Sequence, residues 1–208
     1  MRKSILIPIA ALVIITGCVS MFSSYEEPRY NVVKTYDEIE IRDYSGMIVA
    51  EVTTNGDKEK SINQGFRILA DFIFGNNVPA EKLSMTIPVT QQQDKQIVAM
   101  TAPVTQQPAQ DGSWKIRFTM PSKYTMETLP KPKDDRIKLI QIEPYKAAVI
   151  RFSGTSREKN FTEHKEKLEA FVMQEKLIAA ENVTYAYYNP PWTPWFMKRN
   201  EVIIPLKD

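Results

Sequence analysis

The feature that most constrains this fold is a pattern of predicted elements, strand–strand–helix–strand–strand, that occurs twice in the chain. The first copy covers roughly residues 30–120 and the second roughly residues 137–206. Short turns join the strands within each copy, which favours antiparallel pairing. We therefore predict an α+β fold in which both copies form one sheet or distorted barrel, with two helices packed on it.

Each copy contains one amphipathic helix. The first is predicted from about Asp57 or Ser61 to Phe74, where Ser61 and Gln64 have the spacing of a capping box and Gly75 ends the helix. Its inward face is predicted to consist of Ile62, Phe66, Leu69 and Ile73. The second helix is predicted to begin with a capping box at Thr155–Glu158 and to bury Phe161, Leu168, Phe171 and Val172.

Two nearly identical segments lie between these helices: "MTIPVTQQ" (Met85–Gln92) and "MTAPVTQQ" (Met100–Gln107). Polar residues separate them, so they are predicted to form a hairpin. Pro88 and Pro103 cannot donate a ladder hydrogen bond and must lie at an edge, a bulge or a strand end. The methionines at the start of each segment suit either a core or an apolar ligand pocket, and hairpin register decides which face each occupies.

The N-terminus differs from the rest of the chain. A basic "MRK", an apolar stretch from Ile5 to Ile15 and "ITGC" resemble a bacterial lipoprotein signal. The apolar stretch is shorter than the roughly 20 residues that span a bilayer as a helix. Residues 1–17 are therefore predicted to be a signal peptide, with Cys18 lipidated. A plain secretory signal with an incidental cysteine, or an uncleaved anchor, is the alternative.

Lipidation would place the chain on a membrane. Residues 18–29 would then form a tether, which reaches at most about 40 Å when fully extended. Val19, rather than Asp, favours the outer membrane, with the protein facing the periplasm. Cys18 is the single cysteine, so no disulfide forms within the monomer. Removing Arg2 and Lys3 lowers the basic count from 27 to 25, equal to the 25 acidic residues, which argues against nucleic acid as a partner.

Five segments in order resemble the SOUL heme-binding protein family. They are "GFRILADFIFGNN" (Gly65–Asn77), "MTAPV" (Met100–Val104), "FTMPSKYTMETLPKPKD" (Phe118–Asp134), "AAVIRFSG" (Ala147–Gly154) and "YNPPWTPWFMKRNEV" (Tyr188–Val202). The resemblance covers nearly all of residues 30–206, and residues 30–208 are predicted to form one domain. It implies a distorted antiparallel β-barrel with two flanking helices, built from two pseudo-symmetric βα repeats. It also implies non-covalent binding of heme or another tetrapyrrole, without catalysis.

The resemblance places the tetrapyrrole pocket along the first helix, with Phe66 and Ala70 as apolar contacts. Basic residues suggested for the propionates in relatives correspond here to Asn63 and Asp71, which is a departure, and Arg67 is a substitute one turn from both. We expect Leu69, Met85 and Met100 to complete this tetrapyrrole-binding set. Binding is expected to be weak.

The axial ligand is left open by the sequence. His164, the single histidine, lies on the inward face of the second helix and is expected to be a hydrogen-bonded structural residue. Methionine, tyrosine or no strong axial ligand therefore remains, and no protein metal site is expected. The "PPWTPWF" loop, with Trp192, Trp195 and Phe196, either packs against the barrel, covers the pocket or contacts the membrane.

Two other classes of function compete with tetrapyrrole carriage. The sequence lacks a Gly-rich phosphate loop and an HExxH motif, and neither Cys18 nor His164 has a catalytic partner. We therefore expect no enzymatic activity, with a tetrapyrrole-modifying enzyme as the weaker alternative. The other alternative is a binding module for a lipid or another amphiphilic small molecule, because the twin β-repeat resembles bacterial effector-binding domains.

Overall fold

The computed structural model describes residues 25–93, 113–180, 182–190 and 192–207. The strands are β1 (Tyr30–Tyr36), β2 (Ile39–Tyr44), β3 (Met47–Asn55), β4 (Asn77–Val78), β5 (Val89–Gln93), β6 (Ser113–Thr119), β7 (Lys131–Pro132), β8 (Lys138–Ile142), β9 (Tyr145–Phe152), β10 (Thr184–Tyr187) and β11 (Asn200–Pro205). The helices are α2 (Lys58–Ile73), α3 (Glu158–Gln174) and the 3₁₀ turn η3 (Trp195–Met197).

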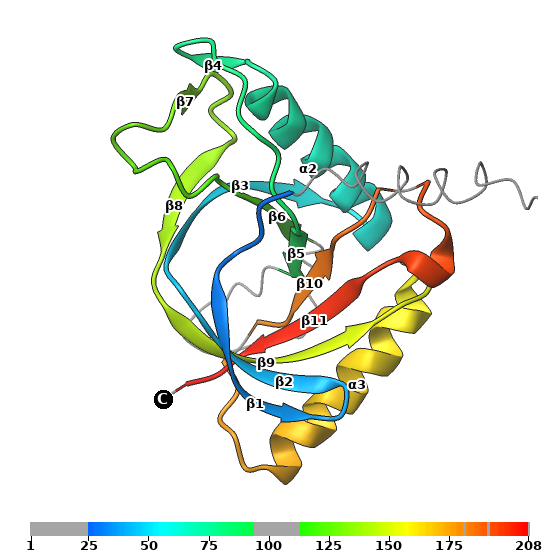
Figure 1. Ribbon diagram of the computed structural model, residues 1–208. Helices are drawn as coiled ribbons and strands as arrows, with labels where there is room; N and C mark the ends of the chain where they lie inside the picture. Colours follow the sequence, from blue (N-terminus) through cyan, green and yellow to red (C-terminus); the bar gives the residue numbers. More distant parts are fainter. Residues whose placement is uncertain (1–24, 94–112, 181, 191, 208) are drawn as a thin grey trace, which may run out of the picture.

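Nine of these strands form one antiparallel sheet that curls into a half-barrel, with α2 and α3 outside it (Figure 1). The strand order is β1-β2-β9-β11-β10-β5-β6-β3-β8. It is symmetric about the β10–β5 pair, because β9, β11 and β10 on one side match β3, β6 and β5 on the other. The predicted α+β fold, a distorted antiparallel barrel with two flanking helices and two repeats, is confirmed.

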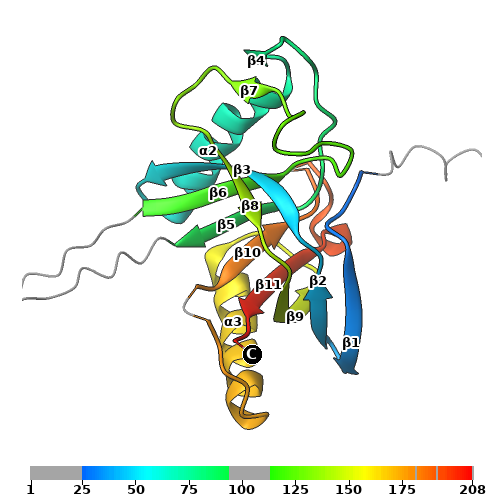
Figure 2. The same ribbon diagram turned by 90° about the vertical axis from the view of Figure 1, so that its left-hand side faces the viewer.

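The two repeats exchange their first strands. β2 leads into β3 along the chain but pairs with β9 of the second repeat, and β8 leads into β9 but pairs with β3 of the first. Each half of the sheet therefore contains a strand from the other repeat. Figure 2 shows the result as one continuous sheet. Sequence pattern predicts the strands but not this exchange, since pairing partners are set by tertiary contacts.

Each helix covers one half of the sheet. α2 packs on β3 and β6 over Ile48, Ala50, Val52, Ile116 and Phe118, and α3 packs on β9 and β11 over Ile150, Phe152, Val202 and Ile204. A third buried cluster, with Tyr44, Val149 and Tyr188, lies between β2, β9, β10 and β11. Strand residues of this cluster alternate with those beneath α3, so they occupy the opposite, concave face of the sheet.

Both predicted capping boxes are wrong. The N-cap of α2 is Asp57, whose carboxylate accepts a hydrogen bond from the Lys60 backbone N–H at 2.8 Å. Ser61 lies inside the helix, buried, and its hydroxyl has no partner among the described residues. The N-cap of α3 is Arg157, which makes no side-chain cap bond. Gly75 follows α2 with a φ of 119°, which is the predicted stop.

The first of the twin segments does not pair as predicted. β5 contains its second half, and both edges of β5 are occupied, one by β6 and the other by β10. Pro88 directly precedes β5, at a strand end as expected. Met85 is half-buried and packs against the core beneath α2. The second segment, with Met100 and Pro103, lies outside the described residues.

The chain before β1 is attached to the domain. The Glu26 carbonyl accepts from the Ile87 N–H at 3.0 Å, and its carboxylate accepts from the Ser122 N–H at 3.0 Å. The Glu27 carboxylate accepts from Arg199 at 3.0 Å. Residues 25–29 of the predicted tether are therefore held against the sheet. Cys18 lies outside the described residues.

Candidate functional site

The residues predicted to form a pocket on the first helix point in different directions. Leu69 and Ala70 are buried beneath α2, in the helix–sheet interface. Phe66 is partly exposed, and its ring contacts that of Phe118 edge-on, with centroids 5.4 Å apart. Arg67 is exposed. A ligand on the outer surface of α2 could therefore touch Phe66 and Arg67, whereas Leu69 and Met85 belong to the core.

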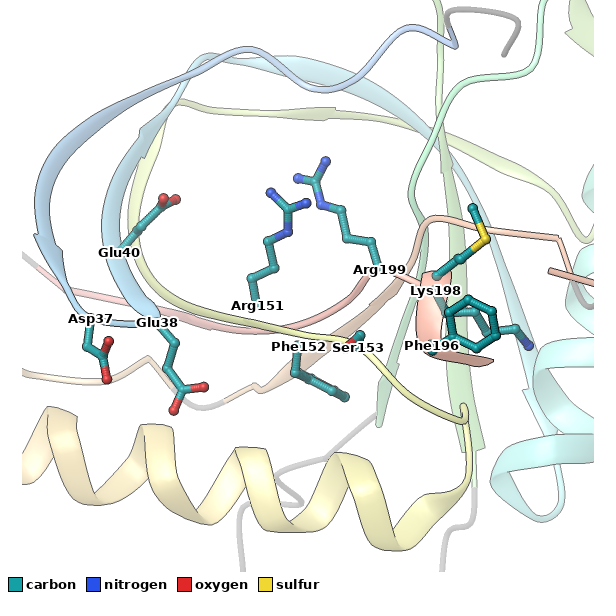
Figure 3. A pocket seen from close by; sticks show the side chains of 10 residues that line it. Asp37, Glu38, Glu40, Arg151, Phe152, Ser153, Phe196, Lys198 and Arg199 are labelled. Carbon is teal, nitrogen blue, oxygen red and sulfur yellow. The ribbon is translucent and has the colours of Figure 1, made fainter. Parts of the chain in front are cut away.

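A separate pocket of about 430 Å³ lies beside η3 (Figure 3). It is lined by residues of the β1–β2 turn, the end of β9 and the aromatic turn before β11: Asp37, Glu38, Glu40, Arg151, Phe152, Ser153, Phe196, Met197, Lys198 and Arg199. Figure 3 shows the Arg151 and Arg199 side chains extending in the same direction from neighbouring strands. Their arrangement follows from the register, because Arg151 lies opposite Glu201, two residues after Arg199.

Half of the charged side chains in this pocket already have partners. Glu40 pairs with Arg42 at 2.7 Å, Glu38 pairs with Lys167, and Arg199 pairs with Glu27 and Glu201. Arg151 is exposed, and within the described ranges its side chain makes no ion pair or hydrogen bond. The pocket therefore offers one free guanidinium beside an aromatic surface, which suits a planar ligand with a carboxylate.

A buried charge network lies next to this pocket. Glu201 and Arg42 are almost completely buried, and two nitrogens of Arg42 donate to the two oxygens of Glu201 at 3.0 and 3.2 Å. Arg199 donates to Glu201 at 2.9 Å, and the Tyr188 hydroxyl donates at 2.6 Å. Burial alone would raise the pKa of the Glu201 carboxyl, but Arg42 and then Arg199 hold it below its usual range.

Aromatic rings surround the network on the concave face. The Arg42 guanidinium lies 4.3 Å from the centroid of Tyr30, and that of Arg199 lies 3.7 Å from the centroid of Tyr188. Tyr44 stacks on Tyr145 with centroids 5.0 Å apart. Burial raises the pKa of Tyr145 to about 12, so this hydroxyl stays protonated at neutral pH. Because every charge is paired and stacked, the network is a structural element of the concave face and not a free ligand site.

Sequence analysis missed both Arg151 and the Arg42–Glu201 pair. Arg42 and Arg151 each alternate with apolar neighbours along their strands, as in "IEIRDY" and "VIRF". That alternation is the pattern of a strand with one solvated face. The sequence pattern therefore does not indicate that the curl of the sheet encloses the second face of β2 and β11.

His164 has the structural role that was expected. Its ring stacks on Phe152 with centroids 3.8 Å apart, and its Nδ1 lies 2.7 Å from the Asn160 carbonyl oxygen. A carbonyl oxygen only accepts, so Nδ1 carries the proton. Phe152 lies between His164 and the pocket beside η3.

A second pocket, of about 470 Å³, lies where residues 26–29 cross the sheet. Its apolar lining comes from Met47, Ile48, Met120, Tyr124 and Met126. Methionines of this kind make an adaptable apolar surface. Glu26 and Glu27 line the same pocket, so any occupant would contact the segment that enters the domain from the N-terminus.

The described residues contain no group of three or more His, Cys, Asp and Glu that could hold a metal ion. They also contain no helix long and apolar enough to cross a membrane. A tetrapyrrole in the pocket beside η3 would meet Phe152 and Phe196 with its ring and Arg151 with a propionate, and the Met197 thioether is a type of axial ligand found in cytochromes.

The curled sheet and its paired repeats define the class of protein as a duplicated α+β half-barrel. The chain belongs to the SOUL heme-binding protein family, whose model matches residues 25–205. This confirms the family predicted from the five sequence segments. Among curated proteins, none matches the sequence.

Solved structures share the fold. The C-terminal domain of EcmrR superposes with a TM-score of 0.61 at 9% identity, covering 86% of this chain and 98% of that one. A hydrolase from Listeria innocua gives 0.54 at 14% identity, with 84% and 94% covered. An uncharacterized conserved protein from Listeria innocua gives 0.51 at 13% identity, with 92% and 98% covered. At such identities the likeness concerns the fold alone.

Proposed function

We propose that this protein is a membrane-tethered carrier that binds heme or a related tetrapyrrole non-covalently and weakly, and that it catalyses no reaction. The observation that carries the proposal is the match to the SOUL family over residues 25–205. Heme, when bound, supplies a flat apolar ring, two propionates and an iron with open axial positions. The protein supplies the surface that orients the ring and pairs with a propionate.

Two surfaces compete for the ligand. One is the outer face of α2, with Phe66 and Arg67. The other is the pocket beside η3, where Arg151 has no ionic partner among the described residues and Phe152 and Phe196 lie close by. We place the ligand in the second, because a guanidinium in a concave site can pair with a carboxylate while the ring packs on the neighbouring aromatic side chains, whereas the convex helix offers less contact for the ring.

Hemin titration of the detergent-solubilised full chain tests binding. A saturable Soret shift with quenching of tryptophan emission is expected at micromolar hemin. Absence of both below tens of micromolar would show that heme is the wrong ligand. Arg151→Ala should weaken binding about tenfold, the cost of one charge-assisted hydrogen bond, and the matched variant Arg67→Ala should leave it unchanged. The reverse result would place the ligand on α2.

The alternative ligand is another amphiphile, and the methionine-lined pocket beside residues 26–29 favours it. A fluorescent fatty acid distinguishes the two. Displacement of the probe by hemin with a matching affinity supports a shared tetrapyrrole site. Saturable probe binding that hemin does not disturb would support a lipid site at Met47 and Met120.

The absence of catalysis is tested by product analysis. Hemin and other porphyrins incubated with the protein, with and without a reductant, should be recovered unchanged by chromatography. A new tetrapyrrole that forms in proportion to protein concentration would contradict the carrier proposal and support an enzyme.

The membrane tether rests on the N-terminal sequence. We propose that residues 1–17 are removed, that Cys18 is lipidated, and that the domain faces the periplasm from the outer membrane. Mass spectrometry of the mature protein should show acyl chains on Cys18, and Cys18→Ser should release the protein from membranes. Retention of this variant in the membrane pellet would mean that the N-terminus is an uncleaved anchor.

A further inference from the structure

We propose that the aromatic loop, Trp192 to Met197, inserts the rings of Trp192 and Trp195 into the interface of the lipid bilayer to which the chain is anchored. This inference rests on the proposed lipid anchor. The observation that carries it is the exposure of four large apolar side chains within six positions: Trp192 is 83% exposed, Trp195 63%, Phe196 61% and Met197 53%. Contiguous exposed apolar side chains of this size mark an interaction surface.

The loop is held in one shape by its backbone. Met197 N–H donates to the Pro194 carbonyl at 2.9 Å, and Gly154 N–H donates to the Trp195 carbonyl at 3.0 Å. The two ends of the loop are joined by Asn189, whose side-chain oxygen accepts a hydrogen bond from the Arg199 backbone N–H at 2.6 Å. The rings therefore project from an ordered turn, so inserting them costs little conformational entropy.

The side chains match the chemistry of a membrane interface. Tryptophan is enriched at the headgroup level, where its ring is partly apolar and its N–H stays hydrated. Lys198 follows the loop, and Arg157 begins α3 three residues after Gly154, which contacts the loop. Neither makes an ion pair with any described residue, so both can face anionic lipid headgroups.

The point where the chain enters the domain lies beside the same loop. Glu27 pairs with Arg199, which is two residues after Met197. From Glu27 back to Cys18 is nine residues, a reach of at most about 30 Å. A lipid on Cys18 therefore keeps the aromatic loop near the bilayer surface, where even modest apolar burial adds to the anchor.

A role as a lid over the pocket beside η3 would explain the exposure of only some side chains of the aromatic loop. Phe196 and Met197 line the pocket beside η3, but Trp192 and Trp195 line neither of the two pockets described above. The exposed rings of Trp192 and Trp195 are therefore left to contact a surface other than a pocket ligand. A bilayer fits better than packing against the barrel, which was one reading of the sequence and which the exposure of these side chains contradicts.

The test uses the full lipidated chain in vesicles that contain phosphatidylglycerol, with and without bromine on the acyl chains. Bromine quenches tryptophan only on close approach, and the chain has three tryptophans, of which Trp114 is partly buried on β6. Emission of the wild-type protein should fall roughly twofold in brominated vesicles if two of the three rings enter the interface. In W192S/W195S the remaining emission should be insensitive to bromine.

A matched control substitutes an exposed apolar pair elsewhere. Met173 near the C-terminal end of α3 and Ile178 just beyond it are 78% and 61% exposed, and M173S/I178S should be quenched like the wild type. Protein that sediments with vesicles but shows no bromine quenching would overturn the docking proposal and leave the anchor intact. Protein that fails to sediment would overturn the anchor, and the docking proposal with it. Hemin affinity, measured separately, is unaffected by either outcome.

Discussion

At the scale of single residues, the most consequential side chains are Arg42 and Glu201. Glu201 is completely buried, and two arginines and one tyrosine satisfy its carboxylate. Such a pair contributes little net stability when intact, because desolvation offsets attraction. Removing one partner, however, strongly destabilises the protein, because the other charge is left buried and unpaired.

Arg42→Ala should therefore lower the free energy of unfolding by about 3 kcal/mol, since it leaves the Glu201 carboxylate buried with fewer donors. Urea titration measures this. Arg136→Ala is the matched control: its pair with Asp134 is exposed, so the loss should stay below about 1 kcal/mol. Equal losses in the two variants would mean that Arg42 is not a buried structural charge.

His164 is a second residue whose role is structural. Its Nδ1 proton is bound to the Asn160 carbonyl, and its ring is stacked on Phe152. His164→Ala should destabilise the protein by about 1 kcal/mol and leave the hemin dissociation constant within about twofold. Loss of the Soret band, with the fold intact by circular dichroism, would instead identify His164 as an axial ligand.

At the scale of elements, the contact of α2 with β6 depends on a glycine. A Cβ placed on Gly65 would lie 2.7 Å from the Ile116 Cβ, and no rotamer change moves that atom. Gly65→Ala gains about 1 kcal/mol of helix propensity but forces the helix off the sheet, at a cost of roughly 1–3 kcal/mol.

We therefore expect Gly65→Ala to be destabilising by about 1 kcal/mol in urea unfolding. Asn63→Ala, at an exposed position of the same helix, should be neutral or slightly stabilising by the propensity term alone. A stabilised Gly65→Ala variant would show that α2 can move away from Ile116 at no cost.

Lys58 joins the two repeats at the start of α2. Its ammonium lies 3.4 Å from the ring centroid of Tyr185, 4.7 Å from Phe161 and 6.0 Å from Trp114. Burial lowers the pKa of Lys58 to about 8, against an ordinary value of 10.5. Above pH 8 the folded chain therefore loses a proton that the unfolded chain retains.

Because the unfolded state binds more protons in this window, the free energy of unfolding should rise from about pH 8 toward pH 10 through this group. Above about pH 10 the buried tyrosines act in the opposite direction, since burial raises their pKa values. Lys58→Met should remove the rise in urea midpoints between pH 7.5 and 9.5. The exposed Lys82→Met should keep it, and a rise that persists in Lys58→Met would assign it to another group.

At the scale of the whole molecule, the exchange of β2 and β8 ties the repeats together. Neither repeat has all strands of its own half of the sheet, so neither half is a complete unit. Unfolding should be a single cooperative transition. Urea curves from tryptophan emission and from far-ultraviolet circular dichroism should coincide. Two separate midpoints would show that the halves unfold independently.

Sequence patterns predicted much of this fold because they are local. Alternating residues in "IEIRDY" and the apolar stripe of α2 follow from the side-chain periods of strand and helix. The prediction that the apolar face of α2 is buried is confirmed for Leu69 and Ile73. Phe66 of the same face is partly exposed, at the edge of the helix–sheet contact. The capping box at Ser61 was wrong because α2 begins one turn earlier, at the alternative start Asp57, and the box at Thr155 was wrong because the N-cap of α3 is Arg157.

The candidate site could be predicted only in part. Phe196 was singled out by its proline-rich motif, and the family assignment followed from five ordered segments. Arg151 could not be found, because its free guanidinium depends on which carboxylates pair with other cations around it. One of these pairings, Glu38 with Lys167, joins the β1–β2 turn to α3, which are far apart in the chain.

By itself, the sequence determined the order and type of the elements, their duplication and the family, since these depend on residue spacing along one segment. Tertiary structure alone decided that β2 and β8 exchange, that β5 lies between β6 and β10, and that Arg42 and Glu201 meet in a closed interior. The physical reason is that strand pairing and charge burial depend on residues distant in the chain, whose proximity exists only once the sheet has curled.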